Sequence, residues 1–443
     1  MTIAEYRAAC MEHFNARKDE LDERARVNIE QHRKGNHTLQ LLDKDGKPAA
    51  GVSVHVKLTN HDFRHGANIF MLDQFDDPEV NQRFREAFPQ YFNAATVPFY
   101  FAGNHPEEGV NRFDKDSSKI FRRPPTDLCV EYCEANGIAP KLHCLYYDKM
   151  TPEWARKKSA DELWDIYEKR FADIAERYTG RLYEIEVTNE TTTLWRSTTT
   201  SALARQRDTT IRMWQMARRY FPYERLVVHD AELCDVGIGS YHSPFYLTIE
   251  NLLHKKATIN KVAVQNHIFM GVSGSQEKDL QTYIKHLIPE NLLHGIEVLG
   301  SFDLPLEISE ITIPTFGEGE EAEQLQADIL RMLYTFWFAT PQIENVTWWN
   351  TADFSAITVP GWDENNCRGG LFHPDMTPKL AALEQKRLFD EEWHTELDLV
   401  TDADGKVTFR GFYGDYQADF GGESFQFGLH RTLPHITTYQ KQL

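Results

Sequence analysis

Eight short apolar runs lie between about residues 65 and 390, and segments long enough to form a helix separate them. Alternation of short apolar runs with helical stretches is typical of a parallel α/β fold. Eight is also the number of strands that closes a TIM (β/α)8 barrel, so we predict this fold. The predicted strands are Ala67–Phe70, Asn93–Val97, Ala139–Cys144, Tyr183–Val187, Arg225–His229, Ala263–His267, Leu306–Ile311 and Val346–Trp349.

The two ends of the chain follow other patterns. Apolar residues recur every three, four or seven positions from Ile3 to Ile29, which predicts one amphipathic helix. Alternating apolar residues then flank a DKDGK turn at 43–47, and the same pattern surrounds a DADGK turn at 402–406. Each pattern predicts a β-hairpin.

Two such hairpins at opposite ends of the chain predict one small accessory β-sandwich built from the N- and C-terminal segments. The predicted organisation is an N-terminal helix at 1–34, the first part of the sandwich at 35–62, the catalytic barrel at 63–390 and the second part of the sandwich at 391–443.

Composition narrows the classes of partner. The formal net charge of −19 argues against nucleic acid and anionic membranes, because both attract positively charged surfaces. The first 31 residues lack the apolar core of a signal peptide, and no apolar run approaches the roughly 20 residues that span a bilayer. The six cysteines are scattered and fit neither a disulfide framework nor a zinc pattern. We therefore expect a cytoplasmic protein with no metal and no cofactor, or a secreted one if a leader has been removed.

Two glutamates carry the strongest indication of chemistry. Glu190 follows the fourth predicted strand in EIEVTNE, and Glu310 ends the seventh in LPLEISEITIP. A (β/α)8 barrel places its active site at the carboxyl ends of its strands, so both carboxylates are expected at one face. Most enzymes that cleave glycosidic bonds use two carboxyl groups, one on each side of the bond. One carboxyl group must stay protonated while the other stays ionised.

Five segments resemble those of glycoside hydrolase family 10, best known as endo-β-1,4-xylanases. EIEVTNE is similar to the family's W-D-V-V-N-E, and ISEIT is similar to I-T-E-L-D. LHCLYYD, Q-N-H and TWWNTAD are similar to the family's segments G-H-T-L-V-W-H, Q-x-H and T-x-W-G-x-x-D. The resemblance implies a retaining glycoside hydrolase that cleaves β-1,4-xylan or xylooligosaccharides by double displacement. It implies that Glu310 is the nucleophile and Glu190 the general acid/base, and that the substrate-binding residues are His143, Tyr147, Asn189, Gln265, His267 and Trp349.

The segment after the second predicted strand departs from the family pattern. Typical members carry T-P-E-N-x-x-K-W there, whereas this chain has TVPFYFAGNHPEEG, which places apolar Phe99 and Tyr100 in the polar region. Asp148 also replaces a histidine. Apolar side chains cannot form hydrogen bonds with sugar hydroxyls, so two alternatives to a xylan-cleaving enzyme stay open. One is a β-glycosidase for a glycoside with an apolar, saponin-like aglycone. The other is a non-catalytic carbohydrate-binding barrel.

Overall fold

The computed structural model describes residues 1–192, 200–432 and 434–440. The chain divides into two compact units. The barrel unit comprises residues 1–16, 65–329 and 345–382, and the sandwich unit comprises residues 17–64, 330–344 and 383–443. The predicted second part of the sandwich, 391–443, includes residues 433 and 441–443, which lie outside the described residues.

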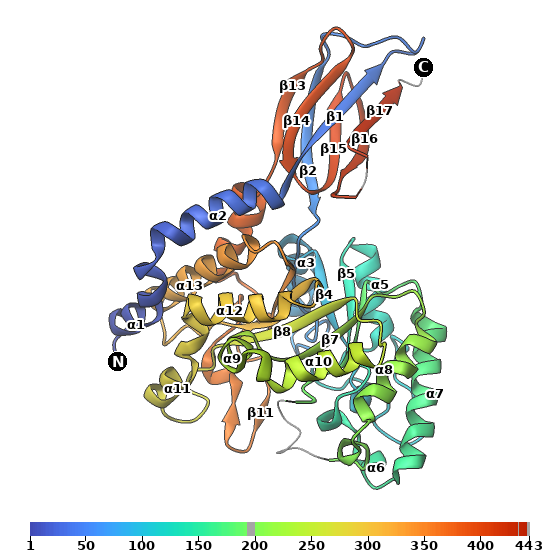
Figure 1. The fold of residues 1–443 in the computed structure, drawn as a ribbon, viewed down its shortest axis with the longest axis vertical. Helices are drawn as coiled ribbons and strands as arrows, with labels where there is room; N and C mark the ends of the chain where they lie inside the picture. Colours follow the sequence, from blue (N-terminus) through green and yellow to red (C-terminus); the bar gives the residue numbers. More distant parts are fainter. Residues whose placement is uncertain (193–199, 433, 441–443) are drawn as a thin grey trace. The chain divides into compact units, whose positions relative to one another are not determined.

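Eight parallel strands form a closed barrel, which confirms the predicted fold class (Figure 1). Neighbouring strands follow one another in chain order, and the last strand returns to the first. The strands are β3 (Arg64–Asn68), β4 (Ala94–Pro98), β5 (Ala139–His143), β6 (Glu184–Thr188), β7 (Leu226–Glu232), β8 (Lys261–His267), β9 (Leu306–Thr312) and β10 (Ile343–Trp348).

Helices follow most of the barrel strands, and their ends carry recognisable capping residues. Helix α7 begins after Ser159, whose side chain accepts a hydrogen bond from the Glu162 N–H, while the Glu162 carboxylate accepts from the Ser159 N–H. The helices of this part of the chain are α1 (Ile3–Ala16), α3 (Pro78–Tyr91), α4 (Phe101–Asn104), α5 (Thr126–Ala135), α6 (Glu153–Arg156), α7 (Ala160–Tyr178), α8 (Thr209–Tyr220), α9 (Leu233–Gly239), α10 (Pro244–His254), α11 (Gln276–Tyr283), α12 (Pro289–Gly300), α13 (Glu320–Phe338) and α14 (Leu380–Arg387). None of the helices in the described residues combines the length and the apolar character that crossing a lipid bilayer requires.

A β-bulge in β9 determines where Glu310 points. Val264 of β8 lies opposite Ile308, but Gln265 lies opposite Glu310, so Ser309 is an extra residue in β9. A bulge re-aims the residues that follow it. Glu307 contacts Lys141 inside the barrel, and Glu310, three positions later, contacts His267. Strict alternation along the strand would put these two glutamates on opposite faces.

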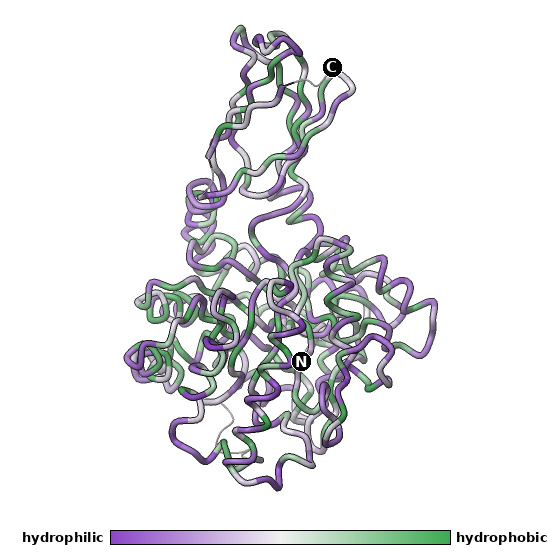
Figure 2. Tube along the Cα trace, turned by 90° about the vertical axis from the view of Figure 1, so that its right-hand side faces the viewer, coloured by the Kyte–Doolittle hydropathy of each residue, from purple (hydrophilic) through white to green (hydrophobic). Residues whose placement is uncertain are grey.

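The sandwich unit consists of two small sheets, and the prediction of two hairpins is wrong. One sheet has the order β14–β1–β17 and the other β13–β2–β15–β16, so each predicted hairpin has its two strands in different sheets. Buried and more exposed residues alternate along much of β1, β2 and β14, which lets each sheet bury one face. Figure 2 shows hydrophobic and hydrophilic residues interspersed along the chain. The strands are β1 (Lys34–Leu42), β2 (Ser53–His61), β13 (Glu396–Val400), β14 (Lys406–Phe412), β15 (Gly414–Phe420), β16 (Glu423–Leu429) and β17 (Ile436–Gln440).

The two aspartate–glycine turns form as expected, although they connect sheets rather than paired strands. The Asp43 carboxylate accepts hydrogen bonds of 2.9 Å from the N–H groups of Asp45 and Lys47. Gly46 has a φ of 76°, which favours glycine. The partners of β1 and β2 are β14 and β13, from the other end of the chain. The sandwich therefore forms from both ends, as predicted.

The N-terminal segment forms two helices rather than the single helix that the sequence predicts. Helix α1 ends at Ala16 and α2 runs from Lys18 to His32. Arg17 between them has φ −118° and ψ 20°, which lies outside the helical region. The apolar spacing continues across this residue, so periodicity alone could not reveal the break.

Candidate active site

The two predicted catalytic glutamates lie at the carboxyl ends of barrel strands. Glu310 belongs to β9 and is only 4% exposed. Glu190 lies two residues beyond the end of β6, is half-buried, and has a φ of 49°. A left-handed conformation is uncommon for a residue other than glycine, and such residues cluster at functional sites.

Two side chains hold the Glu190 carboxylate. The Tyr147 hydroxyl donates a short hydrogen bond to Oε2, and the Gln265 amide donates a hydrogen bond of 3.1 Å to Oε1. Tyr147 follows β5 and Gln265 belongs to β8. Glu190 is therefore fixed from two directions by residues that the sequence had assigned to the same site.

His267 holds the Glu310 carboxylate. Its Nε2 lies 3.3 Å from Oε2 of Glu310, and its Nδ1 lies 2.9 Å from the Thr312 hydroxyl. When the hydroxyl donates to Nδ1, the proton resides on Nε2 and points at Glu310. The other carboxylate oxygen, Oε1, has no hydrogen-bond partner among the described residues. Oε1 is itself buried, and the imidazoles of His143 and His229 lie near it.

The pKa of the Glu310 carboxyl lies well above its usual range. Burial is the main cause, and the negative charges of Glu190 and Glu186 raise the pKa further. His143 and Lys141 act in the opposite direction.

A buried hydrogen-bonded chain runs from Tyr100 into the barrel interior. The Tyr100 hydroxyl lies 2.8 Å from Nε2 of His143, and Nδ1 of His143 makes a short hydrogen bond to Glu186. Lys141 lies 2.8 Å from Glu186 and 2.6 Å from Glu307. Burial alone would raise the pKa of Glu186, but Lys141 and the histidines hold it well below its usual range. His143 is therefore anchored on an ionised carboxylate beneath the site.

His229 contributes a second imidazole to the same cluster. It is fully buried, neither ring nitrogen has a hydrogen-bond partner in the described part of the chain, and burial lowers its pKa to about 3. One ligand atom each from His143, His229 and Glu310 lies within 4.8 Å of the others. Nε2 of His229 is 3.7 Å and Nε2 of His143 is 4.0 Å from Oε1 of Glu310. Zinc bonds of about 2.0–2.2 Å need donors closer together than this, so these atoms fit a metal only after moving.

An aromatic cluster lines the site beside His143. The Trp349 and Phe70 rings meet edge to face at 5.3 Å, Phe70 meets Tyr100 at 5.8 Å, and Tyr100 lies 6.2 Å from Tyr147. Trp349 is 8% exposed and also lies 5.5 Å from the His143 ring. Trp349, which the resemblance assigns to substrate binding, is therefore a neighbour of both His143 and the aromatic segment after β4.

Phe99 does not contribute to this cluster, contrary to the expectation of an apolar Phe99–Tyr100 surface. Its side chain is completely buried and meets the Tyr178 ring edge to face at 5.0 Å. Adjacent residues of an extended chain point to opposite sides, so only Tyr100 faces the site. The departure from the family pattern therefore places a tyrosine hydroxyl on His143.

Asp148, which replaces the family's histidine, anchors the chain at Thr200 and Ser201. Its carboxylate accepts hydrogen bonds of 2.6 Å and 3.2 Å from their N–H groups, and both hydroxyls donate to it as well. Asp148 thus has a positioning role on the rim of the site.

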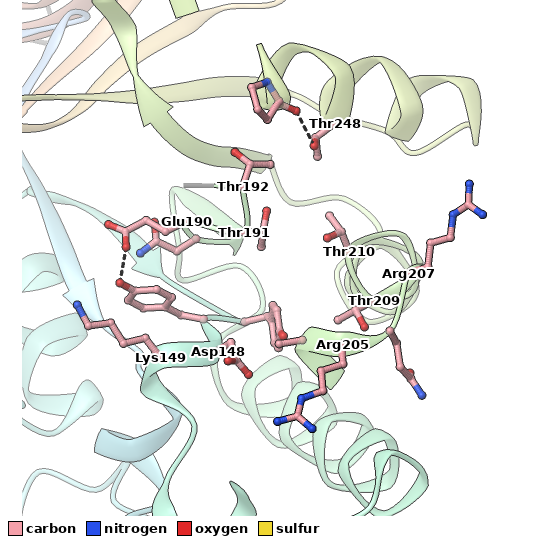
Figure 3. A pocket seen from close by; sticks show the side chains of 16 residues that line it. Asp148, Lys149, Glu190, Thr191, Thr192, Arg205, Arg207, Thr209, Thr210 and Thr248 are labelled. Carbon is pink, nitrogen blue, oxygen red and sulfur yellow. Dashed lines mark hydrogen bonds between the residues drawn. The ribbon is translucent and has the colours of Figure 1, made fainter. Parts of the chain in front are cut away.

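A cavity of about 330 Å³ lies beside Glu190 (Figure 3). Figure 3 shows Glu190 on one side and Arg207 on the other. Asn189 also lines it, and the Oδ1 atom of this buried residue has no partner in the residues described. The remaining lining is mostly polar: Tyr146, Tyr147, Asp148, Lys149, Thr191, Thr192, Ala204, Arg205, Gln206, Thr209, Thr210, Pro244 and Thr248.

The structure brings all eight residues named from the sequence to one end of the barrel, and it adds residues that the sequence reasoning missed. Glu232 accepts a hydrogen bond of 3.1 Å from the His267 N–H, and burial raises its pKa to about 7. The missed residues are buried or half-buried polar residues of the barrel strands β5, β6 and β7. They are Lys141, Glu186, His229 and Glu232.

A closed eight-stranded parallel barrel with paired carboxylates at the carboxyl ends of its strands defines the class: a TIM-barrel protein of the glycoside hydrolase type. The chain belongs to glycosyl hydrolase family 10, whose model matches residues 112–383.

Two curated relatives match most of this chain. Anti-sigma-I factor RsgI6 of Acetivibrio thermocellus is 23% identical over 405 residues, which cover 89% of this chain and 46% of that protein. Endo-1,4-beta-xylanase 2 of Arabidopsis thaliana is 23% identical over 398 residues, which cover 87% of this chain and 32% of that protein. The chain thus spans less than half of the length of these relatives.

Solved structures have the same fold. Xylanase 10B from Thermotoga petrophila RKU-1 in complex with xylobiose aligns with a TM-score of 0.58 at 18% identity and covers 75% of this chain and 95% of that one. Native xylanase 10B from Thermotoga maritima aligns with a TM-score of 0.56 at 19% identity and covers 75% and 96%.

Proposed function

We propose that this protein hydrolyses β-glycosidic bonds with retention of configuration, and that its substrate is a β-1,4-linked xylan or xylooligosaccharide. Family membership supports the reaction class. The xylanase names of relatives and structural neighbours support the substrate class. The observation that carries the proposal is the pair of carboxylates held by one strand: Gln265 of β8 bonds Glu190, and His267 bonds Glu310.

In the proposed mechanism the Glu310 carboxylate, which His267 positions, attacks the anomeric carbon. Glu190 protonates the departing glycosidic oxygen, and a covalent glycosyl–enzyme ester forms on Glu310. Glu190 then removes a proton from water, which attacks the anomeric carbon and releases Glu310. Tyr147 and Gln265 position Glu190 in both steps.

The cavity beside Glu190 is the proposed site of the leaving sugar. General acid catalysis requires the leaving oxygen to lie next to Glu190, and this cavity shares Glu190 with the site. Its threonines can form hydrogen bonds with sugar hydroxyls, which an apolar aglycone lacks. Together with the buried position of Phe99, this lining favours a sugar over the saponin-like alternative.

A non-catalytic role in carbohydrate binding is the second candidate, because one relative carries the name of an anti-sigma factor. The positions of Glu190 and Glu310 favour catalysis, since a binding protein needs no pair of carboxylates fixed by Tyr147, Gln265 and His267.

An aryl β-xyloside and xylooligosaccharides test the proposal. The chain should release the aryl alcohol, and Glu310→Ala should abolish turnover while retaining the fold, as judged by circular dichroism. Binding without turnover in the unmodified chain would support the second candidate and contradict the first.

A further inference from the structure

Two adjacent arginines lie beside the aromatic cluster. The Arg123 guanidinium lies 4.3 Å from the Tyr100 ring centroid, and the Arg122 guanidinium lies 5.5 Å from that of Phe70. Both arginines belong to the segment between α4 and α5, which follows barrel strand β4. They therefore lie at the carboxyl end of the barrel, and the Tyr100 ring lies between Arg123 and His143.

Neither arginine has a carboxylate partner among the described residues. Arg122 is 3% exposed, and it donates to the backbone oxygen of Ser355 while its Nε and Nη2 atoms have no partner. Arg123 is half-buried and donates a hydrogen bond of 2.7 Å to the backbone oxygen of Arg122. By contrast, the more exposed Arg177 and Arg181 form ion pairs with Asp127 and Glu134. Buried Arg33 also lacks a carboxylate but donates to three backbone oxygens, whereas Arg122 keeps two nitrogen atoms without a partner, which leaves it able to bind a ligand.

Two backbone features accompany the arginines: the left-handed conformation of Arg122 and a glycine at position 103. Arg122 has a φ of 60°, a left-handed conformation that is uncommon for a residue other than glycine. A Cβ atom at Gly103 would lie 3.2 Å from Cδ of Arg123, so the absence of a side chain at Gly103 makes room for the arginine stem. Left-handed conformations of this kind persist where the surrounding structure fixes them, often at ligand sites.

The arginines lie across the site from the proposed leaving-group cavity. Phe70, Tyr100 and Trp349 follow strands β3, β4 and β10, which are neighbours in the closed ring. Glu190 follows β6, three strands further round from β3. A substrate that crosses the site from the cavity therefore brings its non-reducing part to the arginines.

We propose that Arg122 and Arg123 bind a carboxylate carried by the sugar chain on the non-reducing side of the cleaved bond, which makes an acidic, uronic-acid-bearing xylooligosaccharide the preferred substrate. A guanidinium is a planar donor that grips a carboxylate through two parallel hydrogen bonds. The aromatic faces beneath the arginines support the cations while their free N–H groups bind the ligand. This inference rests on the proposed hydrolase function and assigns its substrate.

Three oligosaccharides of one chain length test the proposal: a linear xylooligosaccharide, the same chain with a glucuronic acid branch, and its methyl ester. The unmodified chain should cleave the acid on the order of tenfold more efficiently, in kcat/KM, than the ester. Arg123→Gln should bring this ratio close to one, Arg123→Lys should keep part of it, and Arg83→Gln on α3 should leave it unchanged. Rising salt should also reduce the preference.

Binding to the Glu310→Gln variant gives a readout without turnover. Calorimetry should show tighter binding of the acid than of the ester, and Arg123→Gln in this background should remove the difference. Equal kcat/KM for acid and ester in the unmodified chain, or an equal loss for all three substrates in Arg123→Gln, would overturn the inference and leave the hydrolase function intact. Failure to cleave any of the three would overturn the hydrolase function itself.

Discussion

Gln265 and His267 lie two positions apart on β8 and hydrogen-bond different glutamates, Glu190 at 3.1 Å and Glu310 at 3.3 Å. Residues at positions i and i+2 of a strand share one face and are about 6.6 Å apart. One strand thus sets the position of both carboxylates. The proposed division of labour between them, an acid and a nucleophile, leads to the following predictions.

Replacing Glu190 with Ala should affect substrates according to their leaving groups. Xylooligosaccharides need protonation of the departing oxygen, so kcat/KM should fall by about 10²–10⁴-fold. An aryl xyloside with an acidic phenol departs without this help, and formation of its glycosyl–enzyme ester should slow far less. Steady-state and burst kinetics on both substrates measure the difference. Equal losses on the two would argue against the acid role of Glu190.

On the acidic side of the pH–activity profile, activity should fall with an apparent pKa above the ordinary glutamate value of about 4.3. Glu310 attacks only when it is ionised, and burial with nearby negative charges raises its pKa. Activity should therefore be lost as the pH falls through this raised value. An apparent pKa at or below about 4.3 in the unmodified chain would contradict this assignment.

Lys141→Met should strongly destabilise the barrel. The ammonium group lies between Glu186 and Glu307, and its removal leaves both carboxylates buried beside each other. Breaking such a buried ion pair costs about 3–5 kcal/mol. Lys169→Met is the matched control, because Lys169 pairs with Asp173 on the exposed side of α7 and should cost less than about 1 kcal/mol. Urea unfolding of both variants measures the two free energies, and similar values would refute the role given to Lys141.

Arg122→Met should raise the free energy of unfolding, by about 1 kcal/mol or more, because it removes a buried cation without a carboxylate partner. Arg33→Met provides a contrast, since this buried arginine donates to the backbone oxygens of Phe338, Thr340 and Ile343. Its loss leaves those oxygens unpaired and should lower stability. Thermal unfolding decides the sign for each. A loss of stability in Arg122→Met would mean that the arginine serves the fold.

Much of the barrel could be predicted from the sequence because each strand carries a local signal. Eight short apolar runs predicted all eight strands, with boundaries that differ by a few residues. The hairpins failed because a turn such as Asp43–Lys47 has the same local geometry whether its flanking strands pair or enter different sheets. Strands from the two ends of the chain pair in the sandwich with partners more than 300 residues away, such as Asn36 and Arg410, and no local pattern specifies that choice.

In the site, too, residues could be predicted from their own sequence segments, but contacts between separate segments could not. Glu190 and Glu310 stand out in their segments, and the resemblance supplied their companions. The bulge at Ser309, the hydrogen bond from Tyr100 to His143 and the position of Arg123 over Tyr100 arise from contacts between separate strands and loops. These contacts are tertiary, so a single sequence carries no direct sign of them.

The anomeric form of the first product tests the central claim most directly. Proton NMR of a xylooligosaccharide digest, recorded before mutarotation, should show the β-anomer, because two displacements through an ester on Glu310 restore the starting configuration. The α-anomer as the first product would mean direct attack by water, and it would contradict a nucleophilic Glu310.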